Sequence, residues 1–487
     1  MMLWLLRRLP KCGLGPAARG SGQILSLALL CLLAFACGGG EADEPVATAT
    51  PEATTTAEAT ATPVPQPTAT PRPRPEANAF PPDLQAEADR LLQLIVDQRG
   101  TPLERPVDMF LLTREQARLF YSTPEPADTP TPLPAAPTAT PGPPPPPALD
   151  ARQETYELLG LVPKRENVEA PTVQEQQVEN LISIITGFYD DGYKAFYMIE
   201  SINGGVFGPL ARTTIVHELV HALQYQQADI QAIANRRGAN NDAMTALLSV
   251  LEGDAVNTEN LIVGFSTRST YRQPVCFTIP APARTGTPFV VERELDVWYE
   301  DGLCFVRAIA QQGTDGIGGI WERVPSTMEQ ILHPEKYLAG EEAREVTLKQ
   351  LDAALGTGWR NVGENVFGEF GIQNVLLTGL VGDRPGVQAA AAGWGGDRWR
   401  LYANGDSRVL HVETVWDSEG DAAEFAAALE RVLTNRSAGS RAELSATSYS
   451  VDAGGVTWVV SHRGDIVSVV VTNDAATVAP VAGELGL

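Results

Sequence analysis

The sequence predicts an α+β protein, with a larger domain at residues 80–390 that combines a mixed sheet with helices, and a small α+β domain at residues 391–487. Three observations carry this prediction. Apolar residues keep helical spacing after residue 80, a strong hairpin pattern follows in the same region, and strand and helix patterns follow one another after residue 391. A chain of 487 residues with 44% hydrophobic residues has enough material for two or three domains.

The chain is strongly acidic. Its 60 Asp and Glu residues outnumber its 36 Lys and Arg residues and give a formal charge of −24 at pH 7. A surface of this sign is well solvated and repels anionic polymers, so the composition argues against a nucleic-acid partner.

The first 36 residues resemble an export signal. A leader with Arg7, Arg8 and Lys11 and no acidic residue precedes an apolar run at residues 24–36. This run of 13 residues is too short to span a bilayer as a permanent helix. We therefore expect residues 1–36 to be a signal peptide and the remaining chain to be exported.

A cysteine directly follows the apolar run. Residues 34–40, AFACGGG, resemble a bacterial lipoprotein cleavage site, in which small residues precede a Cys that becomes the lipidated N-terminus. We expect Cys37 to carry the lipid and to anchor the protein to the outer face of the cytoplasmic membrane, at the cell surface or in the periplasm. Ordinary signal cleavage that leaves Cys37 as a free thiol is the alternative.

Two low-complexity segments are expected to stay outside the folded core. Residues 37–79 are rich in Pro, Thr and Ala and have too few large apolar side chains to offset the entropy cost of ordering. They predict an extended tether between a membrane and the folded part. Residues 122–148 include five consecutive prolines and interrupt the larger domain, which predicts a surface insertion.

The first folded elements are expected to be a helix and a strand. Asp83 suits the N-cap and Gly100 suits the C-terminal stop of the helix. Residues 106–112, PVDMFLL, then predict a strand, and a helical pattern resumes after residue 149. The apolar face of the first helix is formed by Leu84, Ala88, Leu91 and Ile95.

Residues 182–200 predict a β-hairpin. Two β-rich runs flank Asp190, Asp191 and Gly192, which is the strongest short hairpin signal in the chain. The edge of this hairpin is a candidate for pairing with an extended peptide. An ordinary core hairpin is the alternative.

Residues 212–228, RTTIVHELVHALQYQQA, are the stretch around which the larger domain is organised. His217 and His221 are four residues apart, so on a helix they lie one turn apart on the same face. Two imidazoles in this arrangement can bind one metal ion, with Glu218 beside them as a base. The chain has only five His residues, and two of them at this spacing predict a zinc site. Core histidines with satisfied hydrogen bonds are the alternative.

A carboxylate on a second helix is expected to complete this site, because catalytic zinc normally takes three protein ligands and leaves one position for water. No third His closely follows His221, but a helical pattern at residues 242–265 carries Glu252 within the mostly apolar stretch ALLSVLEGDAV. An unpaired carboxylate would be costly there, and a cation is its natural partner. We therefore expect Glu252 to be the third ligand, with Asp254 and Glu259 as the competing choices.

The rest of the larger domain predicts one strand and three helices. Residues 290–299 have a β-like pattern, whereas residues 302–311 and 367–380 have helical patterns. Residues 326–337 predict a capped short helix that stops before Pro334.

Two cysteines remain once the signal and the lipid site are set aside. These are Cys276 and Cys304. In an exported protein they can close one disulfide, and two buried free thiols are the alternative.

The small C-terminal domain predicts a ββαββα order. Strands are expected at residues 398–402 and 409–416, an amphipathic helix at 418–433, a hairpin at 456–472 and a short helix at the end. Such an order predicts one sheet with helices on one of its faces. No chemistry is indicated for this domain.

The stretches TTIVHELVHALQYQ and LEGDA together resemble the gluzincin group of zinc metallopeptidases. With GFYDDGYKAFYMI and STMEQILHPEKY, they also resemble a set of exported bacterial proteins that are predicted to be such peptidases. The resemblance covers about residues 80–380 and implies a zincin-like fold, bound Zn²⁺ and a peptide or protein substrate. Thermolysin-like members place an Asp four residues after the ligand Glu, but this chain has Val256 there, so Asp254 or Asp229 is expected to support the metal histidines.

The resemblance also implies a mechanism, which the residue chemistry supports. Zinc lowers the pKa of bound water, Glu218 accepts its proton as general base and passes it to the leaving amine, and a donor holds the oxyanion. We expect His333 first as this donor, with Tyr337 and Tyr299 as further candidates, because each can donate beside an apolar stretch.

A catalytically silent binding module stabilised by zinc is the alternative to a peptidase. Two features of the sequence favour the peptidase. Glu218 has no role in a purely structural metal site, and closed structural zinc sites are usually rich in Cys, whereas this sequence offers no such set of Cys ligands.

Overall fold

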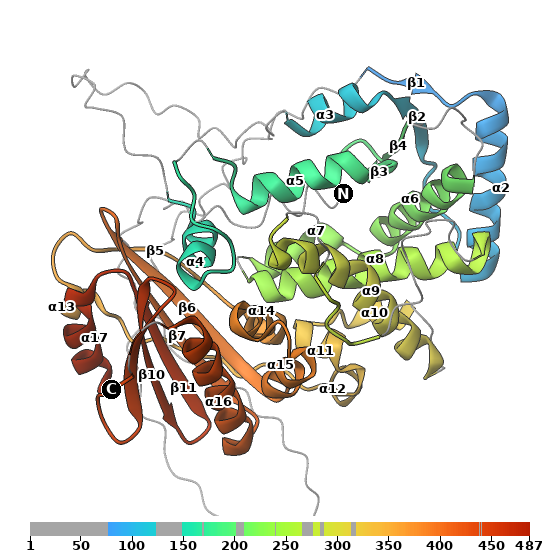
Figure 1. The fold of residues 1–487 in the computed structure, drawn as a ribbon. Coiled ribbons are helices and arrows are strands. Elements are labelled where there is room, and N and C mark those ends of the chain that lie inside the picture. Colours follow the sequence, from blue (N-terminus) through green and yellow to red (C-terminus); the bar gives the residue numbers. More distant parts are fainter. Residues whose placement is uncertain are drawn as a thin grey trace, which may run out of the picture. The chain divides into compact units, whose positions relative to one another are not determined.

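The fold is that of a computed structural model (Figure 1). The signal peptide, Cys37, the tether before residue 76 and all but the first residue of the insertion at 122–148 lie outside the residues that the structure describes. The described residues are 76–122, 149–167, 170–200, 209–238, 240–264, 276–282, 287–312, 318–437, 439 and 441–487.

The N-terminal part of the described chain holds a small sheet and most of the helices. The strands are β1 (Asn78–Ala79), β2 (Asp108–Leu112), β3 (Gly187–Asp190) and β4 (Ala195–Ile199). The helices up to residue 391 are α2 (Pro82–Arg99), α3 (Arg114–Ser122), α4 (Ala151–Leu159), α5 (Val173–Ile184), α6 (Pro209–Gln227), α7 (Ile230–Arg237), α8 (Asn241–Val263), α9 (Phe289–Gln311), α10 (Gly318–Glu322), α11 (Met328–Leu332), α12 (Pro334–Ala339), α13 (Asp352–Leu355), α14 (Gly368–Leu380) and α15 (Arg384–Ala391). None of the helices in the described ranges is long and apolar enough to cross a membrane.

The small sheet has the strand order β1-β2-β4-β3, so β3 is an edge strand of the described sheet. Strand β2 is parallel to β4, whereas β3 pairs with β4 as an antiparallel hairpin. The predicted hairpin is therefore confirmed, although it begins at Gly187 because residues 182–184 belong to the end of α5. The prediction of a strand at 106–112 is confirmed by β2.

Helices cover both faces of this sheet. On one face, Phe196 and Met198 belong to the same apolar cluster as buried residues of α2 and α6. On the other face, Phe188 stacks on Phe120 of α3, with ring centroids 5.4 Å apart. The apolar residues of strands β2 and β4 alternate between the two clusters, as the two-residue period of a strand requires. The core thereby fixes α6 against the sheet.

Helices α8 and α9 cross at two glycines. A Cβ atom added to Gly253 would lie 2.1 Å from the carbonyl carbon of Gly302, and one added to Gly302 would lie 2.1 Å from the carbonyl oxygen of Ser249. The helix backbones therefore touch directly at this crossing, which only glycine permits. The close approach brings the side chains that flank the crossing to the same region of the core.

Two predictions for these helices are wrong. Residues 290–299, predicted as a strand, form the first half of α9. Their buried residues Val290, Val291, Glu294, Val297 and Trp298 follow the helical period, and the β-branched residues that suggested a strand are tolerated because they pack in the core. Asp83 is not the N-cap of α2, because Pro81 takes that position and Pro82 begins the helix.

Other helix predictions are confirmed. Gly100 ends α2 with a φ of 67°, a left-handed conformation that suits glycine. Helix α11 is capped by Thr327, whose side chain accepts a hydrogen bond from the Gln330 N–H, and it ends before Pro334. The helices predicted at 302–311 and 367–380 correspond to the second half of α9 and to α14.

The C-terminal part forms a seven-stranded antiparallel sheet with the order β5-β6-β7-β11-β10-β9-β8. Its predicted strands and its main helix are present, whereas β5, β8 and β9 are strands that the sequence did not predict. Strand β5 pairs with β6, so the sheet includes residues before 391. The elements are β5 (Arg360–Asn365), β6 (Trp394–Asn404), β7 (Ser407–Trp416), α16 (Glu419–Arg436), β8 (Ala442–Glu443), β9 (Ser448–Ala453), β10 (Val456–Arg463), β11 (Ile466–Thr472), a 3₁₀ turn η1 (Ala475–Thr477) and α17 (Val478–Leu485).

Helices lie on both faces of the large sheet, so the predicted one-sided arrangement is wrong. Leu401 and Val460 belong to the same apolar cluster as buried residues of α14, α15 and α16. Their neighbours Tyr402 and Val459 point to the opposite face and pack with residues of α13 and α17. Figure 1 shows α16 on one side of the sheet and α13 with α17 on the other. The described chain is thus an α+β protein with two sheets.

Candidate metal centre

Helix α6 is buried, and the polar side chains of its metal motif are buried with it. Its apolar residues pack against α2 and the small sheet. His221 is only 2% exposed and Glu218 only 8%. Burial of a polar side chain is costly unless a partner compensates it, so the partners of these side chains define the chemistry of the site.

Helix α8 brings Glu252 to the two histidines. The Oε2 atom of Glu252 lies 3.1 Å from His217 Nε2 and 3.6 Å from His221 Nε2. One possible ligand atom from each of the three side chains lies within 4.8 Å of the others. The imidazole planes are nearly perpendicular, at 87°. The structure therefore places all three expected ligands around one point, although they come from two helices.

Glu259, a competing choice for the third ligand, lies behind His217. Its Oε2 atom is 3.5 Å from His217 Nδ1, the ring nitrogen that faces away from Glu252. Glu259 follows Glu252 by two turns of α8, on the same face. An outer carboxylate in this position can orient a metal histidine. The Glu259 carboxylate thus faces His217 Nδ1, whereas the apolar side chain of Val256, one turn after Glu252, has no atom that can accept a hydrogen bond.

Asp254, the other competing choice, reaches His221 through an amide. Gln224 donates a hydrogen bond of 2.8 Å from Nε2 to Asp254 Oδ2, and its Oε1 lies 2.8 Å from His221 Nδ1. Asp229, which was also expected to support a metal histidine, is instead the N-cap of α7, where its side chain accepts from the Ala232 N–H. Of these two acids, the structure brings only Asp254 to the site.

The pKa values of His217 and Glu252 are both shifted by their neighbours. Burial lowers the pKa of His217, but the hydrogen bonds to Glu252 and Glu259 outweigh burial and raise this pKa to about 10. Burial raises the pKa of Glu252, yet the neighbouring His221 and His217 hold it well below its ordinary value. In the metal-free chain the carboxylate therefore stays ionised beside a protonated imidazole. A metal ion that binds there must displace this proton.

Glu218 contacts the edge strand of the small sheet. Its Oε2 atom accepts a hydrogen bond of 2.8 Å from the backbone N–H of Tyr189 in β3. Along a strand, the backbone N–H and C=O groups of successive residues point alternately toward and away from the neighbouring strand. The carbonyl of Thr186, just before β3, points toward β4, because it accepts a hydrogen bond from the Ile199 N–H. The backbone groups of Gly187 and Tyr189 therefore face away from β4. The edge strand runs directly beside the expected general base.

The three candidate oxyanion donors lie in different places. His333 Nε2 lies 3.0 Å from the buried carboxylate of Glu369. Tyr337 is buried, and its hydroxyl donates to the Arg323 carbonyl at 2.7 Å. Only Tyr299 contacts the metal motif, since its ring stacks on His217 with centroids 6.2 Å apart. The structure does not bring His333 or Tyr337 into contact with the motif.

The two cysteines for which the sequence allowed a disulfide or free thiols are paired at α9. Cys276 and Cys304 form a disulfide that joins the segment before α9 to the helix itself.

A second group of side chains in the described residues, Glu329, Glu341 and Asp417, also has the spacing of a metal site. Each of these acids instead lies within 2.7 Å of the ammonium group of Lys336, so a lysine already occupies the place between them.

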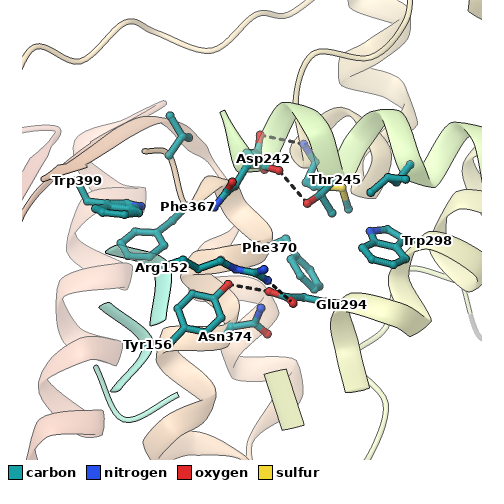
Figure 2. Close-up of a pocket in the computed structure, with 15 residues that line it drawn as sticks. Arg152, Tyr156, Asp242, Thr245, Glu294, Trp298, Phe367, Phe370, Asn374 and Trp399 are labelled. Carbon is teal, nitrogen blue, oxygen red and sulfur yellow. Dashed lines mark hydrogen bonds and ion pairs between the residues drawn. The ribbon is translucent and has the colours of Figure 1, made fainter. Parts of the chain in front are cut away.

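A small cavity lies beside the first turns of α8 (Figure 2). Its volume is about 40 Å³, which is room for a few water molecules rather than for a peptide side chain. The carboxylate of Glu294 in its wall accepts from the Tyr156 hydroxyl at 2.7 Å and from Arg152 at 2.6 Å, as Figure 2 shows. These partners satisfy Glu294, whereas Asp242 Oδ1 and Trp298 Nε1 in the same wall have no hydrogen-bond partner among the described residues.

Sequence comparison adds a finding for the C-terminal sheet. A family model described as a domain of unknown function, DUF8575, matches residues 354–482. These residues include the strands of the large sheet and helices α14 to α16, but none of the residues around His217. Neither a curated protein nor a solved structure matched the chain.

The residues present fit a zinc ion. Two imidazole nitrogens and one carboxylate oxygen are the ligand set of many catalytic zinc sites. Both histidines have an acceptor behind Nδ1, which leaves Nε2 for a metal. Here His217, His221 and Glu252 would hold the ion.

Three supporting groups were not assigned from the sequence. Glu259 was considered only as a ligand, although its two-turn spacing from Glu252 carried the signal. Gln224 follows His221 by three residues and shares its helix face, which was also a usable signal. The Tyr189 N–H has no sequence signal, because only the folded sheet places a backbone group beside Glu218.

Proposed function

We propose that the protein is an exported zinc metallopeptidase that hydrolyses peptide bonds, with a zincin-like arrangement of its catalytic helices. One observation carries the proposal: His217, His221 and Glu252 converge on one point, and Glu218 lies beside them against an edge strand. The donor set is that of a catalytic metal site rather than of a closed structural one. Zinc supplies Lewis-acid chemistry when bound, because it acidifies water and polarises a carbonyl group.

Glu218 is the general base in this proposal. Its carboxylate takes the proton from the attacking water and delivers it to the leaving amine. The Tyr189 N–H fixes Oε2, which leaves Oε1 to face the reacting groups. Tyr299, whose ring stacks on His217, is the donor that we assign to the oxyanion.

Strand β3 is the proposed binding edge for an extended substrate. An incoming peptide can add to β3 through the outward N–H and C=O of Gly187 and the outward C=O of Tyr189. The Tyr189 N–H is used by Glu218 and is unavailable to the peptide. An extended segment of a peptide or unfolded protein is therefore the substrate class that this edge suits.

The decisive experiment compares the full chain with Glu218→Gln. We expect both proteins to bind one zinc ion per chain in elemental analysis, because Glu218 is not a ligand. We expect the variant to cleave a diverse peptide library about 10² to 10⁴ times more slowly, the range for loss of a general base. Full zinc occupancy without cleavage by the parent would leave only a zinc-stabilised binding module. Absence of zinc would exclude both functions.

We further propose that lipid on Cys37 holds the enzyme at the outer face of the cytoplasmic membrane. This proposal rests on the sequence around Cys37, which lies outside the described residues. Cys37→Ser removes the thiol that would carry the lipid. The variant is expected in the soluble fraction after cell lysis, whereas the parent is expected with the membranes, and equal distribution of both proteins would contradict the anchor.

A further inference from the structure

A chain of buried polar side chains extends behind His221. Gln224 Oε1 lies 2.8 Å from His221 Nδ1. The Gln224 amide nitrogen donates to the Leu251 carbonyl at 3.0 Å and to Asp254 Oδ2 at 2.8 Å. Gln224 is 1% exposed and Asp254 is fully buried, so water does not replace these contacts.

The contacts fix the orientation of the Gln224 amide. The Leu251 carbonyl and the Asp254 carboxylate can only accept hydrogen bonds, so the amide nitrogen must face them. The amide oxygen must then face His221, and it can only accept. His221 Nδ1 therefore carries the proton, and its Nε2 lone pair is free toward Glu252 and the proposed metal. The tautomer follows from the identities of the partners.

Arg99 anchors the other end of the chain. It is the last residue of α2, and its Nη2 atom lies 2.5 Å from both Asp254 Oδ1 and Thr258 Oγ1. The guanidinium group compensates the buried charge of Asp254. Helix α2 is thus tied to α8 at the position where α8 supports α6.

The two histidines are supported in different ways. Behind His217 a carboxylate, Glu259, lies directly against Nδ1. Behind His221 the direct partner is a neutral amide, and the charged pair of Asp254 and Arg99 lies one step further away. Loss of the Gln224 amide therefore affects the orientation and the tautomer of the His221 ring, but it does not add or remove a charge next to the ring.

We propose that Gln224, held by Asp254 and Arg99, is a positioning residue that fixes His221 in the tautomer that binds the metal. The proposal rests on the proposed zinc site. It assigns a role to the residue three positions after the second histidine and to the salt bridge between α2 and α8. It predicts that metal affinity depends on the direction of the Gln224 amide.

The first test measures zinc affinity of the full chain by competition with a chromophoric chelator. Gln224→Met keeps the side-chain length but removes all three hydrogen bonds. We expect the affinity to fall about 10-fold to 100-fold, the usual effect of removing an outer partner. The matched control is Gln226→Met on the same helix, which loses two hydrogen bonds to Arg105 and should bind zinc as the parent does.

A second test exchanges the amide and the carboxylate. Gln224→Glu alone places two carboxylates against each other and should weaken zinc binding. The double change Gln224→Glu and Asp254→Asn provides an acceptor for His221 and a donor toward residue 224, so it should regain most of the affinity. The absorption spectrum of the Co²⁺-loaded proteins should change in the single variant and return in the double variant, a readout that is independent of activity.

The outcomes separate this proposal from the proposed function. Zinc binding by Gln224→Met as tight as that of the parent would overturn the positioning role and leave the metal site intact. Failure of the double variant to regain affinity, with both variants folded by circular dichroism, would equally overturn it. A parent chain that binds neither zinc nor cobalt would instead overturn the metal site itself, and the positioning role with it.

Discussion

Two buried histidines in different regions of the molecule have opposite surroundings. His221 in α6 is 2% exposed, and His411 in strand β7 of the large sheet is fully buried. His221 has Gln224 behind one ring nitrogen and Glu252 near the other. Neither ring nitrogen of His411 has a hydrogen-bond partner among the described residues. Burial alone therefore does not distinguish a functional histidine from a structural one.

The difference lies in charge. Acids surround the α6 site, so a cation is favoured there, as a proton on His217 or as a metal ion. His411 lies across from Arg400 in the adjacent strand β6. Burial first, and then the charge of Arg400, lowers the pKa of His411 to about 4. The sheet holds a neutral histidine as a core residue, whereas the α6 helix holds histidines with prepared acceptors. Variants in both regions can test this contrast.

Removal of a metal ligand is expected to have the largest effect. Glu252→Ala removes the carboxylate that faces Nε2 of both imidazoles, so zinc affinity should fall by more than about 100-fold, the upper end for loss of an outer partner. His411→Ala should retain the zinc affinity of the parent. Elemental analysis and chelator competition on both proteins check this prediction. Glu252→Ala with the affinity of the parent would show that another side chain is the third ligand.

Acid should destabilise the large sheet through His411. The pKa of His411 in the folded chain, about 4, lies below the ordinary value of 6.5. Between these two pH values the unfolded chain therefore binds a proton on His411, whereas in the folded chain this side chain stays neutral. Above pH 6.5 His411 does not lower the free energy of unfolding. As the pH falls from 6.5 to 4, this free energy decreases by about 3 kcal/mol in total. Urea unfolding monitored by tryptophan fluorescence at several pH values measures it.

The matched variants for this pH effect are His411→Leu and His462→Leu. His411→Leu removes the titrating group, so its unfolding free energy should depend less on pH between 6.5 and 4 than that of the parent. His462 lies in strand β10 of the same sheet, and its Nε2 donates a hydrogen bond of 3.0 Å to the Gly464 carbonyl near the surface. Its variant should keep the pH dependence of the parent. An equal slope in all three proteins would refute the assignment to His411.

A smaller effect is expected from the hydroxyl of Tyr299. Tyr299→Phe keeps the ring that stacks on His217 but removes the proposed oxyanion donor. We expect kcat to fall about 100-fold, the lower end for loss of such a donor, while zinc affinity stays unchanged. Tyr449→Phe removes a buried hydroxyl from the large sheet and should not affect kcat. A kcat for Tyr299→Phe equal to that of the parent would assign the oxyanion to another group.

The sequence predicted those parts of the fold where the local pattern is strong. The hairpin of β3 and β4 depends on its turn residues, and the end of α2 depends on Gly100, so both were predictable. The first half of α9 was not, because Val290, Val291 and Val297 favour strands locally while their burial follows a helix. Strand β5 gave no strong pattern, since residues 360–365 gain strand structure by pairing with β6.

The residues of the candidate site also fall into those that a local pattern predicts and those that it does not. The spacing of His217 and His221 and the apolar surroundings of Glu252 pointed to one cluster, which the structure brings together. His333 and Tyr337 are candidates by their chemistry alone, and the structure places their polar atoms against Glu369 and Arg323. A donor beside an apolar stretch has no spacing rule that connects it to α6.

By itself, the sequence determined which residues share a helix face, because helical spacing is local. It therefore paired His217 with His221 and singled out Glu252 for its apolar surroundings. Only the tertiary structure decided the contacts that these residues make between elements: the Glu259 carboxylate behind the His217 ring, the Tyr189 N–H on Glu218, and Arg99 on Asp254. These contacts join α2, β3, α6 and α8, and their distances depend on how the helices pack against the small sheet, which no local pattern specifies.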